Sequence, residues 1–229
     1  MNFNLRYRVT VEFLGTAFLL MAVVGSGIMG QRLAGGNVGL ALLANSIATG
    51  AALAALIQAL GPISGAHFNP AVTLADALQG GIAWREVPGY LAAQIIGAFA
   101  GVAAAHLMFG LPPFFVSHHA RSGPALLWSE FIATFGLLMV IWGCARVRSS
   151  AISIAVGAYI AGAYWFTAST SFANPAVTLA RAASDTFAGI RPLDVPGFVV
   201  AQLAATVAAA VCFRWLAPAQ LVSTSKEAA

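Results

Sequence analysis

Charged residues are scarce in this chain of 229 residues. Asp, Glu, Lys and Arg together make up 8% of it, and the mean hydropathy is +0.86. A soluble globular domain carries about 25% charged residues. Because so few charges cannot cover the surface of a soluble domain, the composition excludes that class and predicts a membrane protein.

Cysteine is also scarce. The two cysteines, Cys144 and Cys212, each lie in an apolar stretch, which predicts two buried thiols and no disulfide framework. The 11 basic residues outnumber the 7 acidic ones. They are scattered at the ends of apolar segments, where they suit lipid headgroups, so we expect membrane lipid and no nucleic acid as a partner.

Six apolar runs are long enough to cross roughly 30 Å of hydrocarbon as helices. The first is too long for the core of a signal peptide, so we expect it to be a spanning helix. Seven of the 11 Lys and Arg residues fall on the side of both chain ends, which predicts cytoplasmic termini. We expect the cell (inner) membrane as the location. The runs lie near 10–29, 38–60, 87–109, 125–145, 151–169 and 195–217.

The strongest pattern is an internal repeat. The heptapeptide NPAVTLA occurs at 69–75 and again at 174–180, each time on an apolar stretch too short to span. These stretches predict half-helices over 69–80 and 174–184. Glu12 and Glu130 open the first and fourth long runs, and Val-Pro-Gly precedes the third and sixth. We therefore treat the chain as one domain made of two repeat halves, 1–118 and 119–229.

Three spanning helices per half is an odd number, so the second half must enter from the opposite side of the membrane. The repeat is then inverted, and the two half-helices approach the midplane from opposite faces. The predicted fold is all-α: six transmembrane helices plus two half-helices.

A single Asn-Pro-Ala marks only a helix start, because Asn is a good N-cap and Pro suits the first turn. Two identical copies in an inverted repeat indicate more. On these motifs the chain resembles the aquaporin (major intrinsic protein) family over residues 10–217. The matching motif residues are Asn69, Pro70, Ala71, Asn174, Pro175 and Ala176.

The resemblance implies a passive channel, with no enzymatic activity and no cofactor, assembled as a homotetramer. It also implies that Glu12 and Glu130 accept backbone hydrogen bonds and that His67 lines the pore. Two helix N-termini at the midplane create a positive potential, and the Asn69 and Asn174 amides can donate to a passing oxygen. Neutral solutes are expected to pass, and cations and relayed protons are not.

The selectivity filter departs from the family pattern. An Arg normally follows the second Asn-Pro-Ala, and Val177 stands there. Counting from the motifs predicts a wide, uncharged ring of Thr49, Gly162, Ser171 and Val177. This departure resembles an atypical bacterial subfamily linked to arsenic resistance. It implies arsenite-like metalloids, methylated arsenicals and glycerol as solutes, with some water. A channel mainly for water is the alternative.

Arg181 follows Val177 by four residues and so lies on the same helix face. We weigh two interpretations: a displaced gatekeeper in the outer vestibule, or an arginine that snorkels to lipid headgroups. The pair His118–His119 lies in an outer loop; a metal or pH-sensing role is open, but a solvated pair is the expectation, and we expect no metal site.

A secondary transporter is the rival class, because transporters also use inverted repeats and broken helices. It requires coupling-ion ligands near the midplane, or proton coupling through Glu12 and Glu130. Asp76 and Arg181 lie toward opposite faces, so no ligand set is indicated. An intramembrane enzyme lacks a paired nucleophile and base.

Overall fold

The computed structural model describes residues 3–147 and 149–216, and all the regular structure in these ranges is helical. The predicted end of the second repeat half, 217–229, lies outside the described residues. The helices are α1 (Leu5–Leu33), α2 (Val38–Ser64), α3 (Pro70–Gln79), α4 (Val87–Met108), α5 (Pro124–Val147), α6 (Ile152–Phe166), α7 (Pro175–Arg181) and α8 (Val195–Leu216), with single 3-10 turns at Ser149–Ala151 and Pro192–Asp194.

Every predicted apolar run is a helix. Five helical segments among the described residues are long and apolar enough to cross a membrane: α1, α2, α4, α5 and the segment that ends in α8. The remaining one, α6, has 15 residues and ends at Phe166, three residues before the predicted end at 169. Thr167, which caps it, is extended, so the chain leaves the helix there and enters the loop that precedes α7.

The two half-helices begin at the predicted motifs. Asn69 and Asn174 are the N-caps of α3 and α7, with extended φ angles of −156° and −157°, and a proline follows each. Helix α3 stops at Gly80, whose φ of 82° ends the helical run. Helix α7 ends at Arg181, three residues before the predicted boundary of 184. Tight turns follow it, in which the N–H groups of residues 182–184 each donate to the carbonyl three residues earlier.

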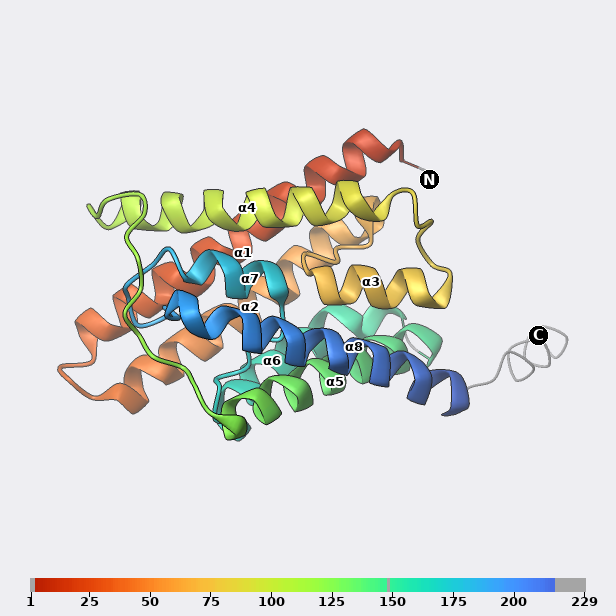
Figure 1. Ribbon diagram of the computed structural model, residues 1–229. Helices are drawn as coiled ribbons and strands as arrows, with labels where there is room; N and C mark the ends of the chain where they lie inside the picture. Colours follow the sequence, from red (N-terminus) through yellow and green to blue (C-terminus); the bar gives the residue numbers. More distant parts are fainter. Residues whose placement is uncertain (1–2, 148, 217–229) are drawn as a thin grey trace, which may run out of the picture.

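The long helices run alongside one another, and α3 and α7 lie between them (Figure 1). Helix α1 packs against α2 and α4, α2 against α6, and α5 against α8. The contact of α1 with α4 is close because Gly97 and Gly101 bring α4 against the α1 backbone at Phe13 and Ala17. The start of α1, the end of α8 and the whole of α3 lie at one end of the bundle.

The polarity of the molecule is reversed relative to a soluble domain. Large apolar side chains cover its outside, among them Phe18, Ile47, Ile96, Trp128 and Ile154, each more than half exposed. Four long polar side chains are fully buried inside: Glu12, Gln94, Glu130 and Gln202. This distribution matches a lipid-facing exterior around a polar interior, which is the arrangement of a multi-pass membrane protein.

Candidate channel and selectivity filter

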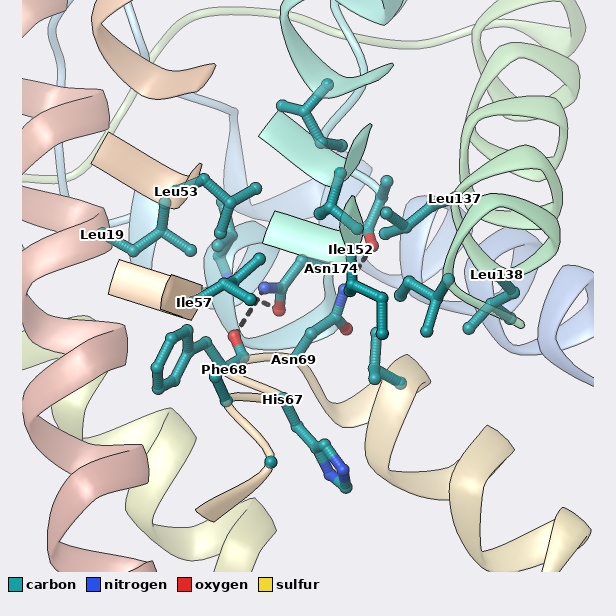
Figure 2. A pocket seen from close by; sticks show the side chains of 18 of the residues that line it. Leu19, Leu53, Ile57, His67, Phe68, Asn69, Leu137, Leu138, Ile152 and Asn174 are labelled. Carbon is teal, nitrogen blue, oxygen red and sulfur yellow. Dashed lines mark hydrogen bonds between the residues drawn. The ribbon is translucent and has the colours of Figure 1, made fainter. Parts of the chain in front are cut away.

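A cavity of about 410 Å³ passes between the half-helices. One end is lined by Arg8, His67 and Asp76, and the other by Thr49 and Arg181. We call these ends the α3 mouth (Arg8, His67, Asp76, Gly81) and the α7 mouth (Thr49, Tyr164, Ser171, Val177, Arg181). The middle has apolar walls. Leu19, Leu53 and Ile57 line one side, and Leu137, Leu138 and Ile152 line the other (Figure 2).

Asn69 and Asn174 meet in the middle of this cavity, between the apolar walls (Figure 2). Their side-chain oxygens cap their own helices: Asn69 Oδ1 accepts from the Ala71 N–H, and Asn174 Oδ1 from the Ala176 and Val177 N–H groups. Capping points both amide nitrogens away from the helices.

The two amides also tie the half-helices together reciprocally. Asn69 Nδ2 donates to the Ala173 carbonyl at 2.7 Å, and Asn174 Nδ2 donates to the Phe68 carbonyl at 2.8 Å. An amide nitrogen carries two N–H groups. Since the described residues take one from each Asn, the second N–H of each is available to a solute in the cavity.

Buried carboxylates hold the loops before the two half-helices. Glu12 accepts the backbone N–H groups of His67 at 3.0 Å and Phe68 at 2.7 Å, and it also accepts from Ser64 and Gln94. In the second half, Glu130 accepts the N–H groups of Phe172 and Ala173, both at 2.9 Å, and Gln202 Nε2 at 2.6 Å. All the partners are donors, as an ionised carboxylate requires.

These carboxylates stabilise an uncommon backbone. Phe68 and Ala173 have φ angles of 47° and 48°, and Ala66, Thr170 and Ser171 are also left-handed. Non-glycine residues adopt this region rarely and at a cost, so the surrounding bonds must select it. The acids thus set the direction of the Phe68 and Ala173 carbonyls, which are the acceptors for the Asn pair.

Three of the four predicted filter residues line the cavity: Thr49, Ser171 and Val177, all buried. Gly162 does not line it. It is exposed on the outside of α6, and a Cβ built on it meets nothing within 4 Å. The prediction for Gly162 is therefore wrong. Helix α6 lines the cavity through the row Ile152, Val156, Ile160 and Tyr164, spaced four residues apart, and Gly162 points away from that row.

Tyr164, which the sequence did not indicate, lines the cavity beside Thr49. Its hydroxyl donates to Thr49 Oγ1 at 3.3 Å, and its side chain is 3% exposed. The α7 mouth therefore combines three hydroxyl side chains, those of Thr49, Tyr164 and Ser171, with the apolar Val177. The Ser171 Oγ is buried and has no hydrogen-bond partner among the described residues, so it can bond a solute.

Arg181 is buried at this mouth, 2% exposed, and lines the cavity. Its guanidinium carbon lies 3.4 Å from the centre of the Phe172 ring, and its Nε donates to the Ala188 carbonyl. A side chain enclosed in this way does not reach lipid headgroups. The snorkelling interpretation is therefore wrong, and the arginine lies at the wall of the cavity.

A second arginine, Arg121, comes from the loop between α4 and α5 and was not predicted. It donates to the carbonyls of Gly189 at 2.8 Å, Ser169 at 3.3 Å and Phe187 at 3.4 Å, and its guanidinium carbon lies 5.0 Å from the Phe172 ring centre. Burial lowers the pKa of Arg121 to about 10, so it stays charged at neutral pH. It connects the loops on both sides of α7.

Two of the histidines contact polar side chains near them. His67 at the α3 mouth lies 3.1 Å from Thr73 Oγ1, and His118 pairs with Asp185 at 3.0 Å on the surface. The backbone N–H of His118, which donates to the Asp185 carboxylate, is the main reason that the pKa of that carboxyl lies below its usual range. In the part of the chain that the structure describes, no three His, Cys, Asp or Glu side chains form a metal-binding group.

Comparison with known proteins agrees with this geometry. Residues 2–151 match the sequence model of the family described as Major intrinsic protein. The chain belongs to the major intrinsic protein family. Among its relatives, "Aquaglyceroporin AqpS" of Rhizobium meliloti (strain 1021) is 54% identical over 94% of this chain and 92% of its own length.

Plant members and a solved structure are also similar. "Aquaporin NIP1-3" of Oryza sativa subsp. japonica is 40% identical over 76% of this chain and 63% of its own length. The X-ray structure of the aquaglyceroporin from Plasmodium falciparum superimposes with a TM-score of 0.73 at 21% identity, covering 96% of this chain and 100% of that one. The major intrinsic protein fold, with two half-helices among the long helices, is therefore confirmed.

Proposed function

We propose that this member of the family is a passive channel for small uncharged solutes. The carrying observation is the reciprocal pairing of Asn69 and Asn174, which leaves one N–H of each amide in the cavity. A solute oxygen that accepts both N–H groups directs its own protons away from the pair. A water molecule held in this way cannot accept a proton from the next water in file, so proton relay stops there.

Cations are excluded at the same place. The N-termini of α3 and α7 point at the cavity centre, and a helix N-terminus carries roughly half a positive charge. The apolar walls offer no ligand to replace the hydration shell of an ion. A neutral solute loses less hydration and meets no repulsion, so the same geometry lets it pass.

The α7 mouth supports hydroxylated solutes as the substrate class. The hydrogen-bonding side of the proposed filter consists of Thr49, Tyr164 and Ser171. Its apolar side is Val177. Glycerol, arsenite-like metalloids and methylated arsenicals combine hydroxyl groups with an apolar or polarisable remainder, which suits such a ring. The relative named as an aquaglyceroporin adds support for glycerol-like solutes.

A channel mainly for water is the second candidate, and one observation favours it. Tyr164 occupies the filter side that the sequence assigned to Gly162. The phenol side chain of Tyr164 narrows the filter, which was expected to be wide. Glycerol and arsenite are then expected to pass more slowly than water, with Tyr164 setting the difference.

We also propose the domain organisation, the assembly and the membrane location of the channel. The two repeat halves 1–118 and 119–229 form one channel domain, assembled as a homotetramer in the cell (inner) membrane with cytoplasmic termini. Glu12 and Glu130 are structural, since their oxygens are occupied by backbone and amide donors. We assign no catalytic step, no cofactor, and no transporter mechanism.

The test is permeability in proteoliposomes. Purified wild-type protein should raise stopped-flow rates for water and for glycerol or arsenite above those of protein-free vesicles, without raising proton conductance. Rates equal to those of empty vesicles for all three solutes contradict the channel proposal. A raised rate for water alone selects the second candidate.

A further inference from the structure

The two mouths of the cavity carry side chains at equivalent places of the repeat. Asp76 follows Asn69 by seven residues, and Arg181 follows Asn174 by seven. Two residues before each Asn stands a ring, His67 in the first half and Phe172 in the second. At the α3 mouth the His67 ring lies 3.7 Å from the Asp76 carboxylate, and at the α7 mouth the Phe172 ring lies under the Arg181 guanidinium.

The charges at these equivalent places are opposite. Among the described residues that line the cavity, Asp76 is the only acid, whereas Arg8 and Arg181 are basic. Arg8 shares the α3 mouth with Asp76, but its guanidinium is paired with the Glu86 carboxylate at 3.0 Å, which offsets its charge there. The half-helix N-termini add positive potential at the centre. Positive charge keeps cations out but attracts anions, so a channel for neutral solutes needs another element against anions.

The position of Asp76 argues for such a role. It lies in the last turn of α3, where a carboxylate is unfavourable because the helix C-terminus already carries partial negative charge. In the described ranges its one polar side-chain partner is His67, and its side chain is 33% exposed. The buried acids Glu12 and Glu130, in contrast, are occupied by donors. A carboxylate that is unfavourable for its own helix and has few partners is expected to have a role outside helix stability. Here that role concerns the cavity that Asp76 lines.

We propose that Asp76 makes the α3 mouth an anion barrier, complementary to Arg181, which repels cations at the α7 mouth. The carboxylate stands at the entrance of the cavity, one third exposed, beside His67 and Gly81. It repels an anion before the positive centre can attract it. The proposal rests on the channel function but assigns to Asp76 a selectivity that the Asn pair cannot supply.

The test compares nitrate, a small anion, with water and glycerol in proteoliposomes. The variants are Asp76→Asn, which removes the charge at similar volume, Asp76→Glu, which keeps it, and Asp185→Asn. The last is the matched control, since it makes the same change in net charge outside the cavity. Nitrate flux is measured under a nitrate gradient, with valinomycin and potassium present so that charge balance does not limit the rate.

We expect Asp76→Asn to raise nitrate flux by about tenfold or more, a change of roughly 1.4 kcal/mol in the barrier. Wild type, Asp76→Glu and Asp185→Asn should stay near the level of empty vesicles. Water flux shows that each variant is folded. If wild type passes water and glycerol but Asp76→Asn passes no more nitrate than Asp185→Asn, the anion barrier is overturned while the channel function stands. If wild type passes neither solute, the channel function itself fails.

A charge-restoration experiment covers the case in which Asp76→Asn loses water flux. Asp76→Cys is made with Cys144 and Cys212 replaced by Ala, and then labelled with a neutral methanethiosulfonate or with one that carries a sulfonate. The neutral adduct should pass nitrate and the sulfonate adduct should not. Equal nitrate flux through both adducts overturns the proposal.

Discussion

Gly50 of α2 and Gly157 of α6 face each other so closely that neither can carry a side chain. A Cβ on Gly50 would lie 2.6 Å from the Gly157 carbonyl oxygen, and a Cβ on Gly157 would meet the Gly50 carbonyl in the same way. This contact brings together the two helices that supply Thr49 and Tyr164 to the filter. The bond between these hydroxyls therefore depends on a pair of glycines.

We predict that Gly50→Ala and Gly157→Ala each destabilise the protein by about 1–3 kcal/mol, as overpacking does. Both should also alter the ratio of glycerol to water permeability, because the helices must separate at Thr49. Gly143→Ala is the control: a Cβ there meets nothing within 4 Å. The thermal unfolding midpoint in detergent and stopped-flow rates are the measurements. A Gly50→Ala protein with the midpoint of Gly143→Ala would contradict the prediction.

The Asn pair gives the second prediction. Asn69→Asp or Asn174→Asp replaces an amide donor by a carboxylate that faces a carbonyl oxygen 2.7–2.8 Å away. The repulsion should open the junction and place negative charge at the midplane. We expect each variant to conduct cations or to lose solute flux.

The matched control is Asn37→Asp. Asn37 caps α2 at the surface by accepting from the Leu40 N–H, and Asp can do the same. Conductance and solute flux are compared at equal protein density. If both junction variants behave like Asn37→Asp, the amides do not select solutes.

The third prediction concerns Tyr164 and Gly162. Tyr164→Ala removes the ring from the filter, so glycerol or arsenite flux should rise several-fold relative to water. Tyr164→Phe removes only the bond to Thr49, and its effect should be smaller. Gly162→His should change neither flux, since that position faces outward on α6. A loss of glycerol flux in Gly162→His would contradict this and would support the filter position predicted from spacing.

The half-helices and the filter position on α6 show what the sequence could predict and what it could not. The half-helices could be predicted because capping Asn and first-turn Pro are local signals, repeated at 69–70 and 174–175. The filter position on α6 could not be predicted, since it depends on how α6 is rotated about its axis relative to the cavity. A count that is wrong by two residues turns a side chain by about 200° around a helix. Arg121 was missed for a similar reason: the carbonyls that its guanidinium contacts lie 48 to 68 residues away, and only the folded loop brings them together.

The fourth prediction is weak inhibition by mercurials. Cys144 and Cys212 are free and half-buried, and neither lines the cavity. Mercury bound to them should leave water flux nearly unchanged. Ser171→Cys places a thiol in the filter and should create a strong block that a reducing thiol reverses. Strong block of wild type, lost when Cys144 or Cys212 is replaced, would mean that one of them controls the pore.

The last prediction tests Arg181 as the cation barrier of the α7 mouth. Arg181→Gln removes a charge that lies over the Phe172 ring and beside the solute path. Cation conductance should therefore rise, and neutral-solute flux should change little. Arg181→Lys keeps the charge but loses the planar guanidinium that stacks on the ring, so it should exclude cations less well than wild type. Arg32→Gln is the control, because Arg32 is exposed at the surface and outside the cavity. Potassium conductance of Arg181→Gln equal to that of Arg32→Gln would assign cation exclusion to the midplane helix ends alone.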